Sequence, residues 1–375
     1  MAWHYPVERL DGDGGATPLE GDVPLQDVSI TQTLSGPDVI SGSVSPEVGR
    51  MMADDGQPLF AGDWTTALYA VNDDQIMGGV IIDQPSFSGP SFSVEGGGFG
   101  GYPYGQPYTD SNFWIGIDYT DAFRQIWTHL QGKEGGNLGL EIDSTTFTGK
   151  KIGTALQQGQ FDTVNGPLTF ESGPFRLAWY QTTDLGAEMD KLVKEAPFDW
   201  RERHWYSGDV IRHALDFGSP KIGNRIEDMR FVFGENIAVS PTVTDHGDEY
   251  ADEILMLGAG EGAAMIRGMA SGPRRGLRRV KVAADKSLKS ISSANAQARV
   301  LWQQSQNIRD VTEITLLDHP HAPAGAVSAG DEIYVEGRLD WLEVGQWMRV
   351  TARTIRPADP SAVVLTLTRT DRMAG

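Results

Sequence analysis

The segment from residue 254 to residue 263 comes nearest, in residue types and spacing, to a cofactor site. Residues 254–257 (ILML) form an apolar run, and residues 258–263 (GAGEGA) follow with the spacing G-x-G-x-x-A. In a dinucleotide site such glycines let the backbone approach a pyrophosphate, which the N-terminus of the next helix binds. Asp285 adds an acidic residue after the next candidate strand. This pattern keeps a nucleotide-dependent enzyme among the alternatives.

The helix that a dinucleotide site needs is not supported by the residues that follow. Gly268, Gly272, Pro273 and Gly276 interrupt the chain before Arg278. No series of alternating strands and helices surrounds the motif, so nothing predicts a parallel sheet. The sequence therefore favours a tight turn between two strands, and no cofactor is expected.

Two histidine- and carboxylate-containing segments are candidates for metal ligands. In residues 318–321 (DHPH), Pro320 imposes an extended backbone, so His319 and His321 are expected to point to opposite sides. Residues 245–249 (DHGDE) lack the D-x-D-x-D-G spacing of a calcium loop. Both segments are interpreted as surface loops, the first one following a strand over 311–317, and no metal site is expected.

No set of residues with the spacing of a known catalytic site is present. Residues 202–204 (ERH) have no serine or aspartate that the sequence places beside them. The patterns G-x-S-x-G, H-E-x-x-H and G-x-x-x-x-G-K-[ST] do not occur. The absence of cysteine excludes disulfides, thiolate catalysis, zinc–thiolate sites and iron–sulfur clusters. No catalytic, cofactor-binding or metal-ligating residue is assigned, and the chain is not expected to be an enzyme.

The charge balance speaks against a protein that binds nucleic acid tightly. Among 375 residues there are 31 Lys and Arg against 51 Asp and Glu, a formal net charge of −20. Affinity for phosphates depends mainly on basic side chains. One basic cluster nevertheless stands out, and it is either a solvated loop and strand edge or a contact with an acidic neighbouring subunit. Its members are Arg274, Arg275, Arg278, Arg279, Lys281, Lys286 and Lys289.

The segment 96–108 (GGGFGGYPYGQPY) is rich in glycine and tyrosine and interrupts the surrounding periodicity. Its aromatic rings could stack on sugars, which leaves a carbohydrate-binding module as an alternative function. The favoured interpretation is a loop that docks on its own domain or on an adjacent copy, because buried aromatic anchors dominate interfaces.

The elements around these candidates are mainly strands. Composition is that of a folded protein, with 39% hydrophobic residues, and 45 Gly and 20 Pro favour β-rich architecture. Alternating apolar and polar side chains predict strands, and helical spacing of apolar side chains predicts three helices. The strands are expected at 25–34, 39–44, 65–71, 76–82, 91–95, 229–233, 253–257, 279–283, 311–317, 333–335, 348–354 and 363–370, and the helices at 118–131, 184–196 and 287–306.

These elements predict three domains. Residues 1–115 are expected to form a first β domain, 116–205 a small α+β domain, and 206–375 a second β domain with one helix. Residues 1–10 lack the pattern of a signal peptide, and no window approaches the roughly 20 apolar residues of a membrane span.

Short segments spread from about residue 25 to about residue 310 together carry a resemblance to a known family. They are Thr33-Leu-Ser-Gly-Pro37, Ile40-Ser-Gly-Ser43, Trp64 with Gly78-Gly79-Val80-Ile81, Gly101-Tyr-Pro-Tyr104-Gly-Gln-Pro-Tyr108, Phe123-Arg-Gln-Ile-Trp127, Gly136-Asn-Leu-Gly139-Leu140, Glu195-Ala-Pro-Phe198-Asp199, Phe233-Gly-Glu-Asn236 and Leu257-Gly-Ala-Gly-Glu-Gly262. In order and spacing they resemble the minor tail proteins of phages that infect actinobacteria.

The resemblance implies a tail hub, similar to the trimeric hub of contractile baseplates, with two tail-tube-like β-barrels and a small mixed domain. A homotrimeric ring would close the tail tube at the tail tip of the virion. It would contact the distal tail ring, the tape measure, and fibres or a spike, and would open for DNA without holding it tightly. Such a protein would be made in the host cytoplasm, and no appended peptidase or lysozyme domain is expected before Gly375.

Overall fold

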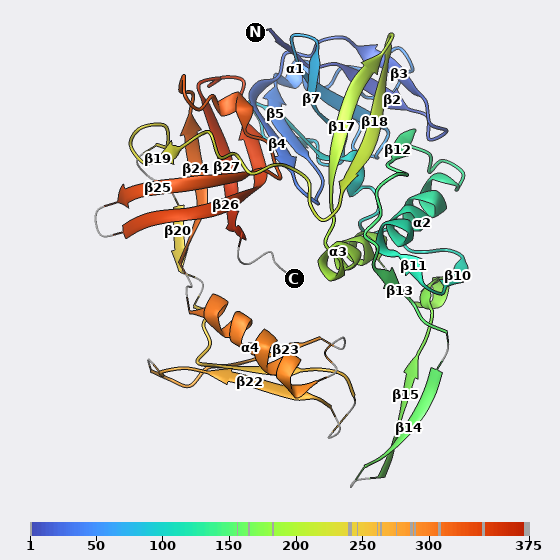
Figure 1. Cartoon of the computed structure of the whole chain (residues 1–375). Helices are drawn as coiled ribbons and strands as arrows, with labels where there is room; N and C mark the ends of the chain where they lie inside the picture. The colour runs from blue at the N-terminus through green and yellow to red at the C-terminus, as the bar shows by residue number, and fades with distance from the viewer. Residues whose placement is uncertain are drawn as a thin grey trace.

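The computed structural model shows a mainly β chain with a few helices (Figure 1). It describes residues 2–370 except 156, 164, 165, 182, 183, 239–241, 246, 261, 263, 264, 275, 286, 287, 289, 307, 308, 340 and 341. Among the described residues, none of the helices combines the length and the apolar character that a membrane crossing needs.

The first part of the chain is built from short strands. Its elements are β1 (Trp3–His4), β2 (Val7–Leu10), β3 (Ala16–Glu20), β4 (Gln26–Thr33), β5 (Val39–Val44), α1 (Pro46–Gly49), β6 (Thr66–Asn72), β7 (Gln75–Ile82), β8 (Ser86–Phe87), β9 (Phe92–Gly98) and the 3₁₀ turn η1 (Phe99–Gly101). The strands predicted at 25–34, 39–44, 65–71, 76–82 and 91–95 are confirmed as β4, β5, β6, β7 and β9.

The middle part mixes helices with short strands. It comprises β10 (Ser111–Trp114), β11 (Ile117–Asp118), α2 (Tyr119–Gln131), β12 (Leu140–Ile142), β13 (Lys151–Ile152), β14 (Gln157–Thr163), β15 (Gly166–Ser172), β16 (Phe175–Ala178), η2 (Trp179–Gln181), α3 (Leu185–Glu195), β17 (Asp199–Ser207) and β18 (Val210–Gly218). The two predicted helices are confirmed as α2 and α3. Each starts at an aspartate whose side chain accepts a hydrogen bond from a backbone N–H of the first turn, Asp118 for α2 and Asp184 for α3.

The last part returns to strands around one long helix. It comprises β19 (Phe231–Val232), β20 (Thr242–Asp245), β21 (Glu253–Leu257), β22 (Arg267–Ser271), β23 (Val280–Ala284), α4 (Ile291–Ser305), β24 (Arg309–Leu317), η4 (Ala324–Ala326), β25 (Glu332–Leu339), β26 (Leu342–Ile355) and β27 (Ala362–Arg369). The helix predicted at 287–306 is therefore confirmed as α4, and the alternation predicted at 363–370 is confirmed by buried Val363, Leu365 and Leu367 on β27.

One sheet connects the two ends of the chain. Its strand order is β20-β24-β27-β26-β4-β5-β9-β7-β6-β2-β3. The connection is the antiparallel pair β4–β26, in which Thr33 lies opposite Ala352 and Ile30 opposite Ile355. Two separate apolar cores pack on this sheet, one around Ile30 and Ile40, the other around Phe231 and Leu365. The N-terminal and C-terminal β regions thus share their hydrogen bonding but not their cores.

A third core lies between β6–β7 and the middle part of the chain. The hairpin β17–β18 pairs from Asp199 to Gly218 and covers a face of the sheet that carries Tyr69. The helices α2 and α3 complete this core with Phe123, Trp127 and other apolar side chains. In Figure 1 the hairpin (yellow-green) lies in front of the blue strands, with α2 and α3 below it.

Ion pairs, of which Arg349–Asp199 is buried, connect the start of the β17–β18 hairpin and the segment after it to the C-terminal strands, and we call these pairs the junction. Arg349 of β26 pairs with Asp199 of β17 and donates to the carbonyl oxygen of Ile222 at 3.0 Å. Glu332 of β25 pairs with both Lys221 and Arg225. The junction therefore places the start of the hairpin against the edge of the C-terminal region.

Candidate functional site

The glycine-rich segment after β21 is a turn between strands, as the sequence favours. β22 returns antiparallel to β21, and α4 starts only at Ile291, after β22 and β23. Residues 261, 263 and 264 of the motif are not among the described ones. Gly260 has φ of +103°, a conformation that side chains with a Cβ rarely adopt. The glycines therefore serve chain reversal in this fold.

The prediction that His319 and His321 point to opposite sides is wrong. Their ring centroids lie 5.4 Å apart, and the backbone N–H of His321 donates to Nδ1 of His319 at 3.3 Å. They do not point to opposite sides, because the chain turns there: the N–H of Ala322 donates to the carbonyl oxygen of His319 at 3.0 Å. The segment does follow a strand, β24, as predicted.

No group of three or more metal-ligating side chains occurs among the residues that the structure describes. In the acidic segment 245–249, His246 and the side chain of Asp245 lie outside the described residues, so its interpretation as a surface loop stays a prediction.

The tyrosine-rich segment docks within its own chain, on Trp64 of the predicted first domain and on α2 and α3 of the predicted second domain. β9 extends to Gly98, so the irregular part begins later than the sequence indicates. The Tyr104 hydroxyl donates to Asp190 of α3 at 2.6 Å, and the Tyr108 ring stacks on His129 of α2 with centroids 3.9 Å apart. The ring of Tyr102 packs against Trp64, with centroids 6.3 Å apart. These rings are engaged within the chain.

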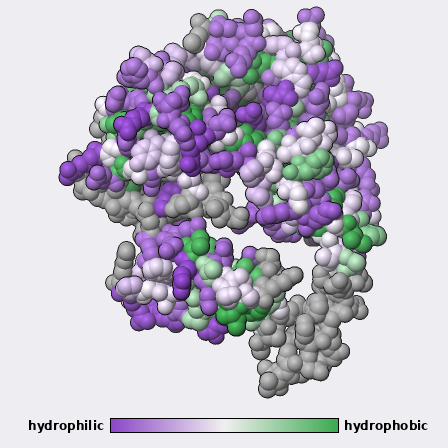
Figure 2. All heavy atoms as spheres, viewed as in Figure 1, coloured by the Kyte–Doolittle hydropathy of each residue, from purple (hydrophilic) through white to green (hydrophobic). Residues whose placement is uncertain are grey.

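The basic cluster lies on the small unit formed by α4 and β21–β23. Of its described members, Arg278 pairs with Glu253 at 2.8 Å and Arg274, Arg279 and Lys281 are exposed; Arg275, Lys286 and Lys289 lie outside the described residues. Exposed apolar side chains accompany it, and Figure 2 shows hydrophobic residues on this unit at the bottom. They are Met269, Leu277, Val280, Val282 and Ile291. A surface of this kind is typical of protein–protein contacts.

The most unusual chemistry of the chain lies under the β17–β18 hairpin, where ionisable side chains form a buried row. Nε2 of His204 lies 3.6 Å from a Glu202 oxygen, and Nδ1 of His204 lies 3.0 Å from Nδ1 of His213. Nε2 of His213 lies 3.4 Å from the Tyr69 hydroxyl, which is hydrogen-bonded to Glu8 in turn. We call these five side chains the buried row.

Burial sets the protonation of the buried row. It raises the pKa of Glu202 to about 8 and lowers the pKa of His204 to about 4 and that of His213 to about 3. Burial also raises the pKa of Glu8. Removing a charged form from water is costly, so Glu202, His204 and His213 are held in their neutral forms. At neutral pH these three side chains therefore carry little net charge.

Glu202 is fixed by backbone donors. Its carboxyl oxygens accept from the N–H groups of Phe99 at 2.9 Å, Gly100 at 3.1 Å and Asp38 at 3.2 Å. A Cβ on Gly98 or Gly100 would meet this carboxyl at 2.2 Å and 3.0 Å, so glycine is required for the approach. Because its oxygens are engaged in this way, Glu202 acts as an anchor for the turn after β9.

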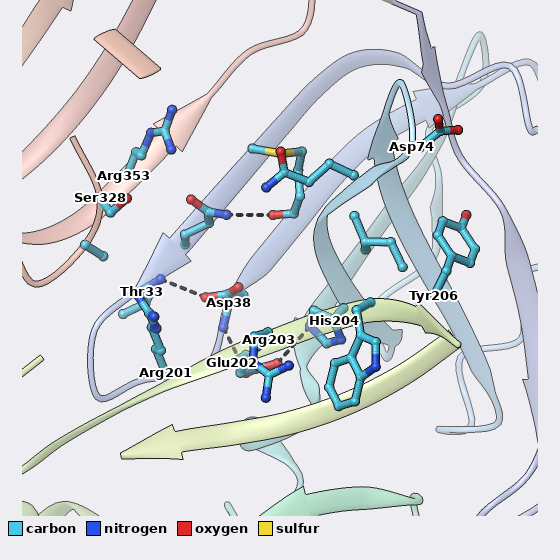
Figure 3. A pocket seen from close by; sticks show the side chains of 16 residues that line it. Thr33, Asp38, Asp74, Arg201, Glu202, Arg203, His204, Tyr206, Ser328 and Arg353 are labelled. Carbon is cyan, nitrogen blue, oxygen red and sulfur yellow. Dashed lines mark hydrogen bonds and ion pairs between the residues drawn. The ribbon is translucent and has the colours of Figure 1, made fainter. Parts of the chain in front are cut away.

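Beside the buried row lies a cavity of about 590 Å³ (Figure 3). Its walls come from four segments of the chain: β4 with the following turn, the β6–β7 turn with the start of β7, β17, and the C-terminal segment with Ser328 and Arg353. The charged side chains along it are Asp38, Asp74, Arg201, Glu202, Arg203 and Arg353. Its size and its few converging polar groups fit a small-molecule site.

Sequence reasoning considered residues 202–204 but missed their partners. The structure brings Asp38 to Glu202 and His213 to His204, and the second pair faces across the hairpin register. Recognising a hairpin over 199–218 was the one signal that could have joined His204 to His213. No local sequence pattern indicates that His204 or His213 lies near Asp38 or Arg353.

The fold of this chain is similar to that of several solved proteins. No family model matches the sequence, and no curated protein matches it. Among solved structures, it is similar to the 43 kDa tail protein of prophage MuSo2 from Shewanella oneidensis, with a TM-score of 0.57 and 11% identity over 99% of both chains. It is also similar to prophage tail protein gp18 from Listeria monocytogenes (TM-score 0.53, 10% identity, 98% of this chain and 95% of that one). A tail protein from Neisseria meningitidis gives a TM-score of 0.51 with 14% identity, over 99% and 97% of the two chains. The chain therefore has the fold of these tail proteins along nearly its whole length.

Proposed function

We propose that this chain is a structural protein of a phage tail, and specifically the tail hub at the tip. The observation that carries the proposal is the full-length correspondence of its fold with three prophage tail proteins. The resemblance of its short segments to minor tail proteins supports the same role. A phage that infects actinobacteria is the source that those segments favour.

The proposed assembly is a homotrimeric ring that closes the tail tube and contacts the distal tail ring, the tape measure, and fibres or a spike. Each copy would contribute its two β regions, which the β4–β26 pair already holds side by side. Three copies would then present six such regions to a sixfold tail. The domain division at residues 115 and 205 belongs to this proposal.

The exposed unit of α4 and β21–β23 supports assembly with other protein surfaces. Its basic side chains stand out in a chain of net charge −20, and Leu277 beside them is 89% exposed. Opposite potentials steer and align protein partners. We assign this surface to a contact with an acidic neighbouring subunit.

Electron microscopy of the tail tip, in particles that contain this protein, tests the proposal. We expect three copies in one ring around the tube axis. A ring with one, two or six copies would contradict the hub assignment. Absence of the protein from purified particles, measured by mass spectrometry, would contradict a virion role altogether.

A DNA titration tests the proposed passage of DNA through the ring. A duplex held by many lysine and arginine contacts would resist sliding, and such contacts strengthen as salt falls. We therefore expect no appreciable binding of double-stranded DNA even at low ionic strength. Tight, salt-sensitive binding that is lost when Arg274, Arg278 and Arg279 are replaced by glutamine would show that the basic cluster faces DNA.

A further inference from the structure

Arg353 is a buried cation that forms no ion pair in the described part of the chain. Its residue is 8% exposed, and its Nε has no hydrogen-bond partner. Among the described residues the structure gives its guanidinium neither a hydrogen bond nor an ion pair. Burial lowers its pKa, and the charge of Asp331 compensates for this only in part. A charged group removed from water is normally paired, so an unpaired one indicates a missing partner.

Another arginine on the same strand shows how this fold supplies partners to a buried guanidinium. Arg349, four residues earlier on β26, is also buried, at 5% exposed. It pairs with Asp199 and donates to the carbonyl oxygens of Ile222 and Gly330. The fold therefore supplies hydrogen-bond and ion-pair partners to one buried guanidinium of β26. The other one, Arg353, lines a cavity.

A second arginine lines the same cavity. Arg201 of β17 is exposed, and within the described part of the chain it makes no ion pair. In Figure 3 its side chain rises next to Thr33, between the hairpin and the strand that carries Arg353. Arg203, the third arginine of the lining, is already paired with Asp216 at 2.7 Å. Two of the three cationic groups thus lack an anion.

The acidic side chains near Arg353 are engaged elsewhere. Glu202 accepts three backbone N–H groups, and Asp38 accepts the N–H of Thr33 at 2.7 Å. Burial raises the pKa of both carboxyls, which reduces their negative charge. Asp331, which acts on Arg353 through its charge, accepts the N–H groups of Asn224 and Ser328. None of these carboxyls is hydrogen-bonded to Arg353.

We propose that the cavity between β4, β17 and β26 binds an oxyanion, a carboxylate or a phosphoryl group, through Arg353 and Arg201. Both chemistries fit the planar guanidinium, which can donate two parallel hydrogen bonds to either group. The hydroxyl of Ser328, on the same wall as Arg353, is a further donor. The volume of about 590 Å³ admits a small polyanion or an acidic side chain of another polypeptide. The proposal does not depend on the tail role.

Thermal unfolding and calorimetric titration of the full chain test whether the cavity binds an anion. The probes are inorganic phosphate, citrate and an oligoglutamate peptide. Each is compared with sodium chloride at the same ionic strength. We expect a saturable rise of Tm with at least one probe, because a ligand that binds only the folded state stabilises it. Tighter binding of the peptide assigns the anion to a polypeptide, and tighter binding of citrate or phosphate assigns it to a solute.

The variant Arg353→Met separates a binding residue from a structural one. Without ligand it should unfold at the same temperature as the unmodified protein or higher, since it removes an unpaired buried charge, and it should lose the anion-dependent shift. Arg201→Gln, at an exposed position, should fold normally and bind at least tenfold more weakly. Arg225→Gln, an arginine outside the cavity, is the matched control and should keep the shift. No saturable shift with any probe, or a shift retained by both cavity variants, would overturn the proposal.

Discussion

The interior under the β17–β18 hairpin and the junction along β25–β26 both bury ionisable side chains, but in opposite charge states. Under the hairpin, burial holds Glu202, His204 and His213 in their neutral forms. At the junction, Glu332 keeps its charge, because hydrogen bonds from Lys221 and Arg225 outweigh burial and lower its pKa. The difference shows that, in these two regions, a buried carboxyl keeps its charge where cationic partners are hydrogen-bonded to it and loses it where they are absent.

The largest expected effect comes from removing one partner of the buried Arg349–Asp199 ion pair at the junction. Arg349→Met leaves Asp199 without its counter-ion, and breaking a buried pair in this way costs about 3–5 kcal/mol. Urea unfolding should show this loss in the free energy of unfolding. The double variant Arg349→Met with Asp199→Asn should recover part of it. A loss below about 1 kcal/mol would mean that the junction behaves like a surface pair.

Measuring the free energy of unfolding over a range of pH tests whether burial keeps the side chains under the β17–β18 hairpin neutral. Folding lowers the pKa of His204 and His213 from 6.5, so the unfolded chain binds more protons below that value and stability falls as pH decreases. Between pH 6.5 and 5 each histidine should account for a loss of about 2 kcal/mol. Glu202 acts in the other direction, since its raised pKa adds stability that is lost as pH rises toward about 8.

Comparison of the unmodified protein with His213→Gln isolates the histidine contribution. The stability difference between the two should change by about 2 kcal/mol in favour of the variant from pH 6.5 to pH 5. His321→Gln, at an exposed position, is the control and should follow the unmodified profile. Parallel profiles for His213→Gln and the unmodified protein would contradict burial as the cause.

A glycine substitution outside both regions shows how large a loss of stability is when no charged group is involved. Gly260→Ala forces a Cβ onto a residue with φ of +103°, which costs on the order of 1 kcal/mol. The loss should appear in urea unfolding without any change in nucleotide affinity. Gly325→Ala, at a glycine with open space around it, should be close to neutral. A micromolar affinity for NAD or ATP that Gly260→Ala abolishes would contradict the interpretation as a turn.

The smallest expected effect lies at the exposed rim of the junction. The Lys221 side chain is 38% exposed, and its partner Glu332 keeps Arg225 when Lys221 is replaced. Lys221→Met should therefore cost less than about 1 kcal/mol in urea unfolding. A cost close to that of Arg349→Met would show that pairing, and not burial, decides the energy of the junction.

Local patterns allowed much of the fold to be predicted. In α2, Phe123, Ile126, Trp127 and Leu130 recur at helical spacing and are all buried in one core. In β27 the period of two gives the buried positions directly. Such predictions succeed because one apolar face faces one core.

The hairpin β17–β18 escaped prediction because its buried positions are not apolar. On β17 the core-facing side carries Glu202 and His204, while Arg201 and Arg203 face solvent, so hydrophobicity does not alternate. The prediction that His319 and His321 point to opposite sides was wrong because Pro320 lies inside a turn from residue 319 to residue 322. The cavity that Arg353 lines is formed by four segments of the chain, and no local pattern in the sequence indicates that they meet.

The pairing of β4 with β26 also has a consequence for the order of events during synthesis. Thr33 and its partner Ala352 are more than 300 positions apart, so β4 leaves the ribosome long before its second neighbour exists. Until then β4 pairs only with β5, and its other edge offers unpaired backbone groups to any strand nearby. Contacts of such long range slow folding and prolong the exposure of intermediates to aggregation. A chain interrupted before β26 would keep this edge open permanently.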